Sequence, residues 1–208
     1  MGFGHIYVKA DAEKVAEAVE AHLAAKGFRR TSMSPERHPS RMKEIHEGQL
    51  RLFWMSPRLA GWTGLFEFRY YSNEVRARWG YTDEGLALAL SALGETWRLE
   101  VLDGSRFWLY AKYAGGSEVE GKAYQDQYGE RSPDRTHPRY ALNDIIEREG
   151  FPHVGLGYEH IPGPDVAPIE NVPMDGTGIE GLEKFRHFAF EPTPGAPKPE
   201  PEADHDHP

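Results

Sequence analysis

Apolar residues recur every three to four positions in residues 11–26 and again in residues 82–93, which predicts two amphipathic helices. In the first of them Val15, Val19 and Leu23 form one narrow apolar stripe, as expected of a helix that packs on a sheet. A comparable stripe runs along the second stretch. We therefore expect both helices to cover one side of the same sheet.

Polar residues and a glycine mark the ends of these two stretches. Asp11 and Thr82 stand where a helix N-cap accepts hydrogen bonds from backbone N–H groups. Gly27 stands where a helix that ends in the left-handed conformation favours a residue without a side chain. The first helix is therefore expected to be capped by Asp11, and the second by Thr82.

Other segments alternate between apolar and polar residues, which is the pattern of half-buried antiparallel strands. In one of them Leu50, Leu52 and Trp54 share one face, whereas Arg51 and Phe53 share the other. The segments predicted as strands are residues 5–9, 28–32, 49–55, 64–71, 74–79, 95–102, 105–114 and 117–122.

Residues 105–114 carry apolar and aromatic side chains on both faces. This pattern predicts a central strand, or a strand whose second face meets another element. Asp103 and Gly104 directly before it are typical of a two-residue hairpin turn, and residues 114–117 form a looser turn signal. Residues 95–122 are therefore expected to form a meander of three strands.

The order strand, helix, strands occurs twice, in residues 1–60 and 61–125, which together form the predicted core domain. It predicts an α+β fold, with a mostly antiparallel sheet and helices packed on one face. A pseudo-duplication of β-α-β-β units is one interpretation of this order, although the two cycles share pattern and not residue identity.

After residue 125 the composition changes, and an irregular C-terminal extension is expected. Residues 138–149 favour a helix with proline in its first turn, and residues 162–181 are rich in proline and glycine. Residues 126–190 are therefore predicted to be a helix plus a Pro/Gly-rich extension that packs on the core. Residues 191–208 are acidic, rich in proline and lack large apolar side chains, which predicts a disordered tail.

The bulk composition is typical of a soluble protein. The chain has 208 residues, enough for one sizeable domain, and it contains no cysteine, which excludes disulfides and cysteine-ligated zinc. No apolar run approaches the roughly 20 residues that span a bilayer, and the first residues lack the pattern of a secretory signal. We therefore expect a cytoplasmic protein without a membrane partner.

Charge is unevenly distributed along the chain. Residues 1–80 contain 13 Lys and Arg against 9 Asp and Glu, whereas residues 81–208 contain 11 against 24, for a net charge of −9. Such an acidic second half argues against a nucleic-acid-binding protein as a whole. A local basic patch in the first half remains open.

Signatures of catalysis, metal binding and cofactor binding are not found. Neither a Gly-x-Ser-x-Gly turn nor a dinucleotide or phosphate loop occurs. His153, His160 and His187 could be imagined as metal ligands, but His153 and His160 would point to opposite faces of a strand. We expect no catalytic residue, no metal and no cofactor. Chance pairs among the 33 acidic residues leave an enzyme with an unrecognised site as an alternative.

Arginines gather in the first half of the chain and have two interpretations. In one, they form a solvated surface that discourages pairing at a sheet edge. In the other, they bind an acidic partner or a phosphate backbone. The candidate partner-binding arginines are Arg29, Arg30, Arg37, Arg41 and Arg51.

Tryptophan has two interpretations as well. Trp54, Trp62 and Trp108 are either core anchors or parts of an exposed aromatic surface, since tryptophan and arginine are frequent anchors of protein interfaces. We favour packing in the core and keep the three as weak candidates for partner binding.

Taken together, these patterns favour a non-catalytic, macromolecule-binding protein of a bacterial type, such as an immunity-like inhibitor or an adaptor. Its expected partner is another protein, recognised in part by charge complementarity. One alternative is a structural or assembly subunit that associates with copies of itself as a homo-oligomer. The other is the enzyme with an unrecognised site.

Overall fold

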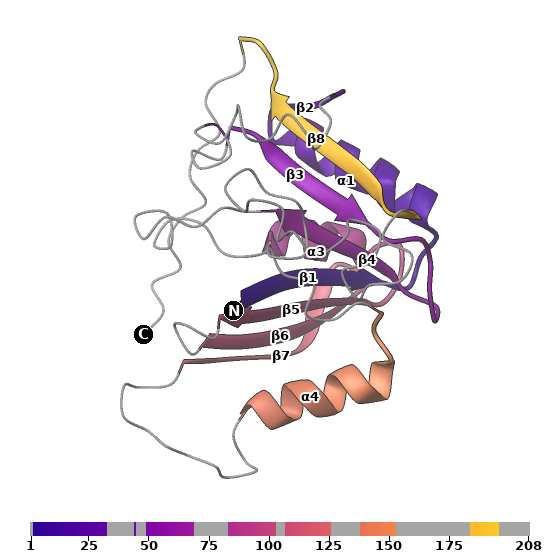
Figure 1. The fold of residues 1–208 in the computed structure, drawn as a ribbon, viewed down its shortest axis with the longest axis vertical. Coiled ribbons are helices and arrows are strands. Elements are labelled where there is room, and N and C mark those ends of the chain that lie inside the picture. Colours follow the sequence, from indigo (N-terminus) through magenta and orange to yellow (C-terminus); the bar gives the residue numbers. More distant parts are fainter. Residues whose placement is uncertain are drawn as a thin grey trace, which may run out of the picture.

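The computed structural model contains one antiparallel sheet of eight strands in the order β2-β8-β3-β4-β1-β5-β6-β7. It describes residues 2–32, 44, 49–68, 83–102, 107–125, 138–152 and 184–195. The strands are β1 (Gly2–Val8), β2 (Phe28–Thr31), β3 (Arg51–Met55), β4 (Thr63–Phe68), β5 (Thr96–Leu102), β6 (Phe107–Ala114), β7 (Ser117–Gln125) and β8 (Arg186–Pro192). The helices are α1 (Ala12–Ala25), α3 (Glu84–Leu90) and α4 (Pro138–Glu149). This arrangement confirms the predicted α+β fold (Figure 1).

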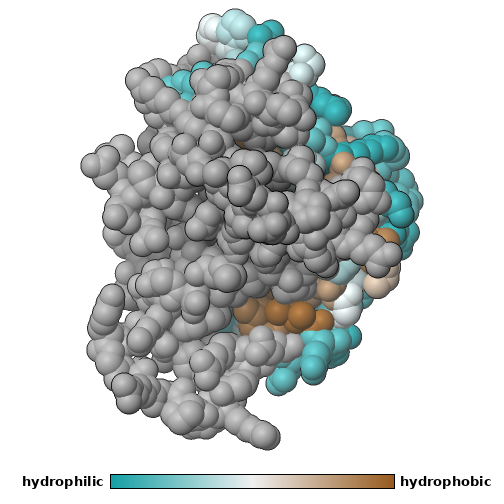
Figure 2. Space-filling model, viewed as in Figure 1, coloured by the Kyte–Doolittle hydropathy of each residue, from teal (hydrophilic) through white to brown (hydrophobic). Residues whose placement is uncertain are grey.

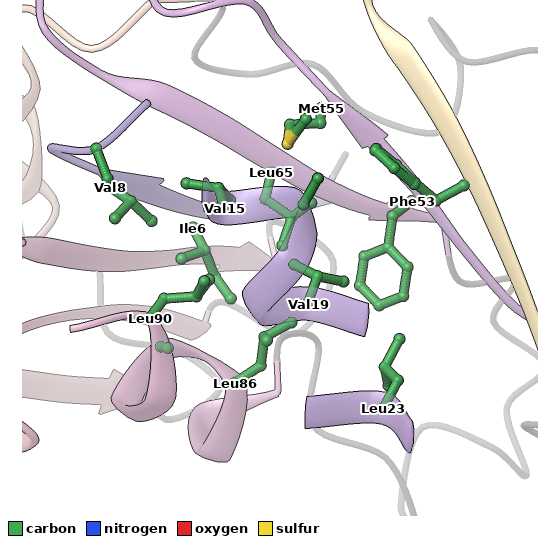
Figure 3. Packing of buried hydrophobic residues seen from close by; sticks show 14 of the residues in the cluster. Ile6, Val8, Val15, Val19, Leu23, Phe53, Met55, Leu65, Leu86 and Leu90 are labelled. Atoms are coloured by element: carbon green, nitrogen blue, oxygen red, sulfur yellow. The ribbon is translucent and has the colours of Figure 1, made fainter. Parts of the chain in front are cut away.

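Helices α1 and α3 cover one face of the sheet together, as their apolar stripes predict. Val15, Val19 and Leu23 of α1 join Leu86 and Leu90 of α3 in one buried cluster (Figure 3). The sheet contributes to this cluster from β1, β3 and β4, with Ile6, Val8, Phe53, Met55 and Leu65. We call this side the α1/α3 face.

Helix α4 lies on the opposite side of the sheet, the α4 face. Leu142 and Ile145 of α4 share a second buried cluster with Leu52, Trp97 and Leu99. Alternation along β3 divides its residues between the two clusters as the sequence predicts: Leu52 and Trp54 on the α4 face, Phe53 and Met55 on the α1/α3 face. The apolar residues on both faces of β6 have the same explanation, because α3 packs against one face of this strand and α4 against the other.

The helix caps differ in part from the prediction. Gly27 ends α1 with a φ of 82°, as expected of a residue after a helix, and Asp11 occupies the N-cap position. The Asp11 carboxylate makes no cap hydrogen bond, however, and instead accepts one from Arg58. The second helix begins at Glu84 and is capped by Asp83, whose Oδ1 accepts from the Leu86 N–H at 2.9 Å. Thr82 is therefore not the cap, and it lies outside the described residues.

Strand β8 enters the sheet between β2 and β3, far from its neighbours in the sequence. Phe188 and Phe190 bury their rings on the α1/α3 face. Glu191 and Pro192 pair with β2 and belong to this strand, so the tail cannot begin at 191. Residues 196–208 and the predicted strand 74–79 lie outside the described residues. The proposed duplication of the two cycles therefore stays a prediction.

Candidate functional site

The two candidate arginines of β2 are exposed but bound to acidic side chains of the same chain. Arg29 donates to Glu191 at 2.7 Å, and Arg30 donates to Glu20 of α1. The Arg30 guanidinium also lies over the Phe188 ring, 4.7 Å from its centroid. Strand β2 is thus a short edge occupied by charged side chains, an arrangement that discourages pairing with another strand. Arg37 and Arg41 lie outside the described residues.

Arg51 is largely enclosed, with 11% of its side chain exposed, and its guanidinium is bound to acidic side chains of the same chain. Its Nε and a terminal nitrogen donate to the two oxygens of Glu67 at 2.7 and 3.0 Å. Its other terminal nitrogen donates to Asp83 at 3.0 Å. The alternation was right in placing Arg51 on the same face as Phe53, but α1 and α3 cover that face.

Asp83 is the centre of this buried charge network. Lys26 Nζ lies 3.0 Å and His22 Nε2 lies 3.2 Å from Asp83 Oδ2, while Oδ1 caps α3. Burial alone would raise the pKa of Asp83, but the hydrogen bond from His22 and the charges of Arg51 and Lys26 outweigh it. They hold the pKa well below its usual range. The network joins α1, α3, β3 and β4, and its charges neutralise one another within the core.

A second buried pair lies on β5. Arg98 donates through two nitrogens to Glu100 Oε1 at 3.0 and 2.9 Å, and through the third to Glu84 at 3.1 Å. Burial opposes the positive charge, yet the Glu100 carboxylate keeps the pKa of Arg98 above its ordinary value. This guanidinium is therefore held as a fixed ion against the start of α3.

Two of the three candidate tryptophans, Trp54 and Trp62, lie in the core, which is the interpretation that the sequence favours. Trp54 is 7% exposed and Trp62 is 1% exposed. The Trp62 indole N–H donates to the Glu149 carbonyl at 2.9 Å, and its ring meets that of Phe151. The backbone of Trp108 pairs with Val101 and Tyr124 inside the β5-β6-β7 meander.

His5 is a buried titratable group on the α4 side of the sheet. It is 1% exposed, its Nδ1 lies 2.8 Å from the Gly4 carbonyl, and its ring meets Phe66 edge to face. Burial lowers the pKa of His5 to about 3, although the hydrogen bond with Gly4 acts in the opposite direction. The native protein therefore holds this imidazole neutral where the unfolded chain would protonate it.

This burial makes stability depend on pH. Between about pH 6.5 and 3 the unfolded chain binds a proton at His5 that the native protein does not. The free energy of unfolding therefore falls as the pH falls, by about 1.4 kcal/mol per unit once the pH is well below 6.5. When the pH is lowered from about 7 to about 5, we expect the free energy of unfolding to fall by about 2 kcal/mol less in His5→Leu than in the wild type. Urea denaturation of both proteins at the two pH values measures this difference, and equal losses would contradict it.

The opposite edge of the sheet, β7, is long and exposed. Eight of its nine residues pair with β6 on one side, and no other described strand pairs with its second side. Residues 117–123 are all exposed, and Val119 is 58% exposed. A register shift leaves Val119 as an extra residue, since Lys112 pairs with Glu120 and Tyr113 with Glu118. From Glu120 to Gln125 the ladder is regular, so this stretch can present a row of outward N–H and C=O groups.

The signals for these features differ in strength. The length of β7 follows from the alternation in the sequence, but its place at the edge follows only from the sheet order. Asp83 directly precedes an apolar helical stretch and was therefore recognisable as a cap candidate. Its three basic partners come from distant parts of the chain.

Neither a metal cluster nor a membrane-spanning helix occurs in the described part of the chain. Among those residues no three His, Cys, Asp or Glu side chains come together as metal ligands, and His153 and His160 lie outside them. None of the described helices has the length and apolar character needed to cross a bilayer. Comparison of the chain with protein-family models, curated proteins and solved structures finds no match.

Proposed function

We propose that the protein is a non-catalytic binding protein that docks a protein partner by adding an extended strand of that partner to β7. The observation that carries the proposal is the nine-residue edge strand β7, whose residues 117–123 are exposed and whose ladder is regular from Glu120 to Gln125. Strand addition at such an edge uses main-chain hydrogen bonds for affinity and side-chain contacts for specificity.

The charge distribution supports a protein partner over a nucleic acid. The exposed β7 side chains include acids and a base, Glu118, Glu120 and Lys122, which form no basic stripe for a phosphate backbone. Arg29 and Arg30 are compensated by Glu191 and Glu20. An immunity-like inhibitor or an adaptor in the cytoplasm both fit a binding protein of this kind.

The buried charges support a scaffold and not a reaction centre. Asp83 and Arg98 each lie 3.0 Å or less from a group of opposite charge, and both contact the start of α3. Asp83 already accepts hydrogen bonds from three side chains and from the α3 backbone. Groups held in this way stabilise the packing of α1 and α3 on the sheet.

Two proline variants of β7 test the proposal. Adjacent residues of a strand direct their N–H groups to opposite sides, so one of Lys122 and Ala123 bonds to β6 and the other faces outward. Of Lys122→Pro and Ala123→Pro, we expect one to lower the melting temperature. The other should keep it but lose at least about tenfold in affinity for extended peptides, because it lacks an outward donor.

Peptides selected from a random displayed library against the full wild-type chain serve as the probe, and fluorescence polarisation measures their affinity for each variant. The destabilised variant is the matched control, because it shows which N–H belongs to the β6 ladder. Equal peptide affinity of wild type and of the variant that keeps its melting temperature would contradict strand addition at β7.

A further inference from the structure

We infer that the strand added to β7 is β7 of a second copy of this chain, so that two sheets join across a two-fold axis. This inference rests on the proposed strand addition at β7 and names its partner. The joined sheet would contain eight strands from each copy, with the two β7 strands antiparallel at its centre. An isologous contact of this kind places each residue i opposite a residue j whose number makes a constant sum with it.

The charges of β7 select one such register. With Gly121 opposite Gly121 of the second copy, the constant sum is 242, and Glu120 of each copy lies opposite Lys122 of the other. The interface then contains two pairs of opposite charge. Opposite charges at directly facing positions of antiparallel strands stabilise the pairing.

The neighbouring registers lack this match. A dyad at Glu120 sets Glu120 against itself, and a dyad at Lys122 sets Lys122 against itself. Like charges directly opposite each other destabilise a strand pair. Of the three dyads, only the one at Gly121 avoids a facing pair of like charge.

Within residues 120–122, the faces of the strand are consistent with this arrangement. Lys122 pairs with Tyr110, which packs with the α4 cluster, so Glu120 and Lys122 lie on the α4 face. Gly121 pairs with Ala111 and lies on the α1/α3 face, where a Cβ would come 2.4 Å from Glu118 Oε1. The absence of a side chain at the dyad leaves that room to Glu118. The two Glu118 carboxylates would lie on the same side of the dimer and limit its affinity.

Partly buried apolar side chains lie near β7 among the described residues. Helix α4 packs against β6, and its Ile146 is only partly buried, as is Tyr110 of β6. Figure 2 shows a hydrophobic patch at the surface beside α4, in the lower part of the molecule. A strand added to β7 widens the sheet next to this patch.

Pairing of the two β7 strands also explains how charged edge residues can favour one contact while opposing others. Charges on an edge strand commonly prevent unlimited sheet growth. Here they alternate in sign around Gly121, so they accept a copy of themselves in one register. Among the described strands, the remaining edges of the dimer are the two short β2 strands with their paired arginines.

A charge-exchange series tests the dimer. Glu120→Lys and Lys122→Glu each turn both attractive pairs into repulsive ones, and each is expected to weaken self-association about tenfold or more. A mixture of the two variants restores both pairs in a heterodimer, and so does the double exchange in a single chain. Sedimentation equilibrium of the full chain over a concentration series at low salt measures these constants, and unchanged melting temperatures confirm that the exposed substitutions leave the fold intact.

Two results would overturn the inference. One is a wild-type chain that remains monomeric over the whole series. The other is self-association that none of the exchanges alters, which would place the contact elsewhere. Neither result decides strand addition itself, because the proline variants measure peptide binding at β7 independently. Conversely, a dimer that follows the charge series with no peptide affinity at β7 would limit the edge to self-pairing.

Discussion

Asp83→Ala is expected to lower the free energy of unfolding by about 3–5 kcal/mol, because it removes the acceptor from a buried charge network. Arg51 and Lys26 would lose a carboxylate partner beneath α1 and α3, and α3 would lose its cap. Asp83→Asn retains an oxygen that can cap the helix. The fall in the free energy of unfolding of this variant therefore reports the loss of the negative charge alone. Urea denaturation at neutral pH measures both variants.

Asp11→Ala is the matched control, because Asp11 occupies the N-cap of α1 without a cap hydrogen bond. Its ion pair with Arg58 is between exposed side chains, so a loss below about 1 kcal/mol is expected. Equal losses for Asp11→Ala and Asp83→Ala would show that the buried network contributes nothing beyond an ordinary helix end.

Trp62→Ala is expected to cost about 3–5 kcal/mol in the free energy of unfolding, since it empties a large site between the sheet and the end of α4. The Trp62 ring packs against Phe151, and Lys9 Nζ lies over it, 4.6 Å from its centroid. Its N–H holds the Glu149 carbonyl, at the last residue of α4. Loss of the ring removes packing and this hydrogen bond together.

Trp62→Phe separates the two contributions, because it keeps an aromatic ring and deletes the donor. Trp62→Phe should lower the free energy of unfolding less than Trp62→Ala does. The difference between the two losses reports the packing of the aromatic ring. Urea denaturation of both variants, followed by circular dichroism, supplies the values. A Trp62→Ala protein of wild-type stability would contradict the core role.

Alternation in the sequence was sufficient to predict the faces of β3, because burial of every second side chain is a local property of a half-buried strand. It did not predict the burial of Arg51. That burial depends on Glu67 in β4 and Asp83 at α3, and each is brought to Arg51 only by the folded sheet. The same limit applies to Arg29 of β2, which meets Glu191 across a long stretch of chain.

The cap of α3 shows a finer limit. Thr82 and Asp83 are adjacent residues that both favour an N-cap, and the choice falls on the residue whose carboxylate also meets Lys26 and Arg51. Likewise, the prediction that residues 126–190 pack on the core did not include the insertion of β8 between β2 and β3. Composition carries no information on strand order, and so the exposed edge at β7 was found only from the sheet.

The position of β8 constrains the order in which this protein can be completed during synthesis. Strands β2 and β3 emerge from the ribosome long before residues 186–192, and both must wait for them. Until then Phe28 and Phe53 lack the packing partners that Phe188 and Phe190 supply in the folded protein, and the position of β8 between β2 and β3 is unoccupied. Binding of a chaperone to the exposed edges of β2 and β3 would protect the chain from aggregation. Because β8 pairs with strands far from it in the sequence, slow folding is expected.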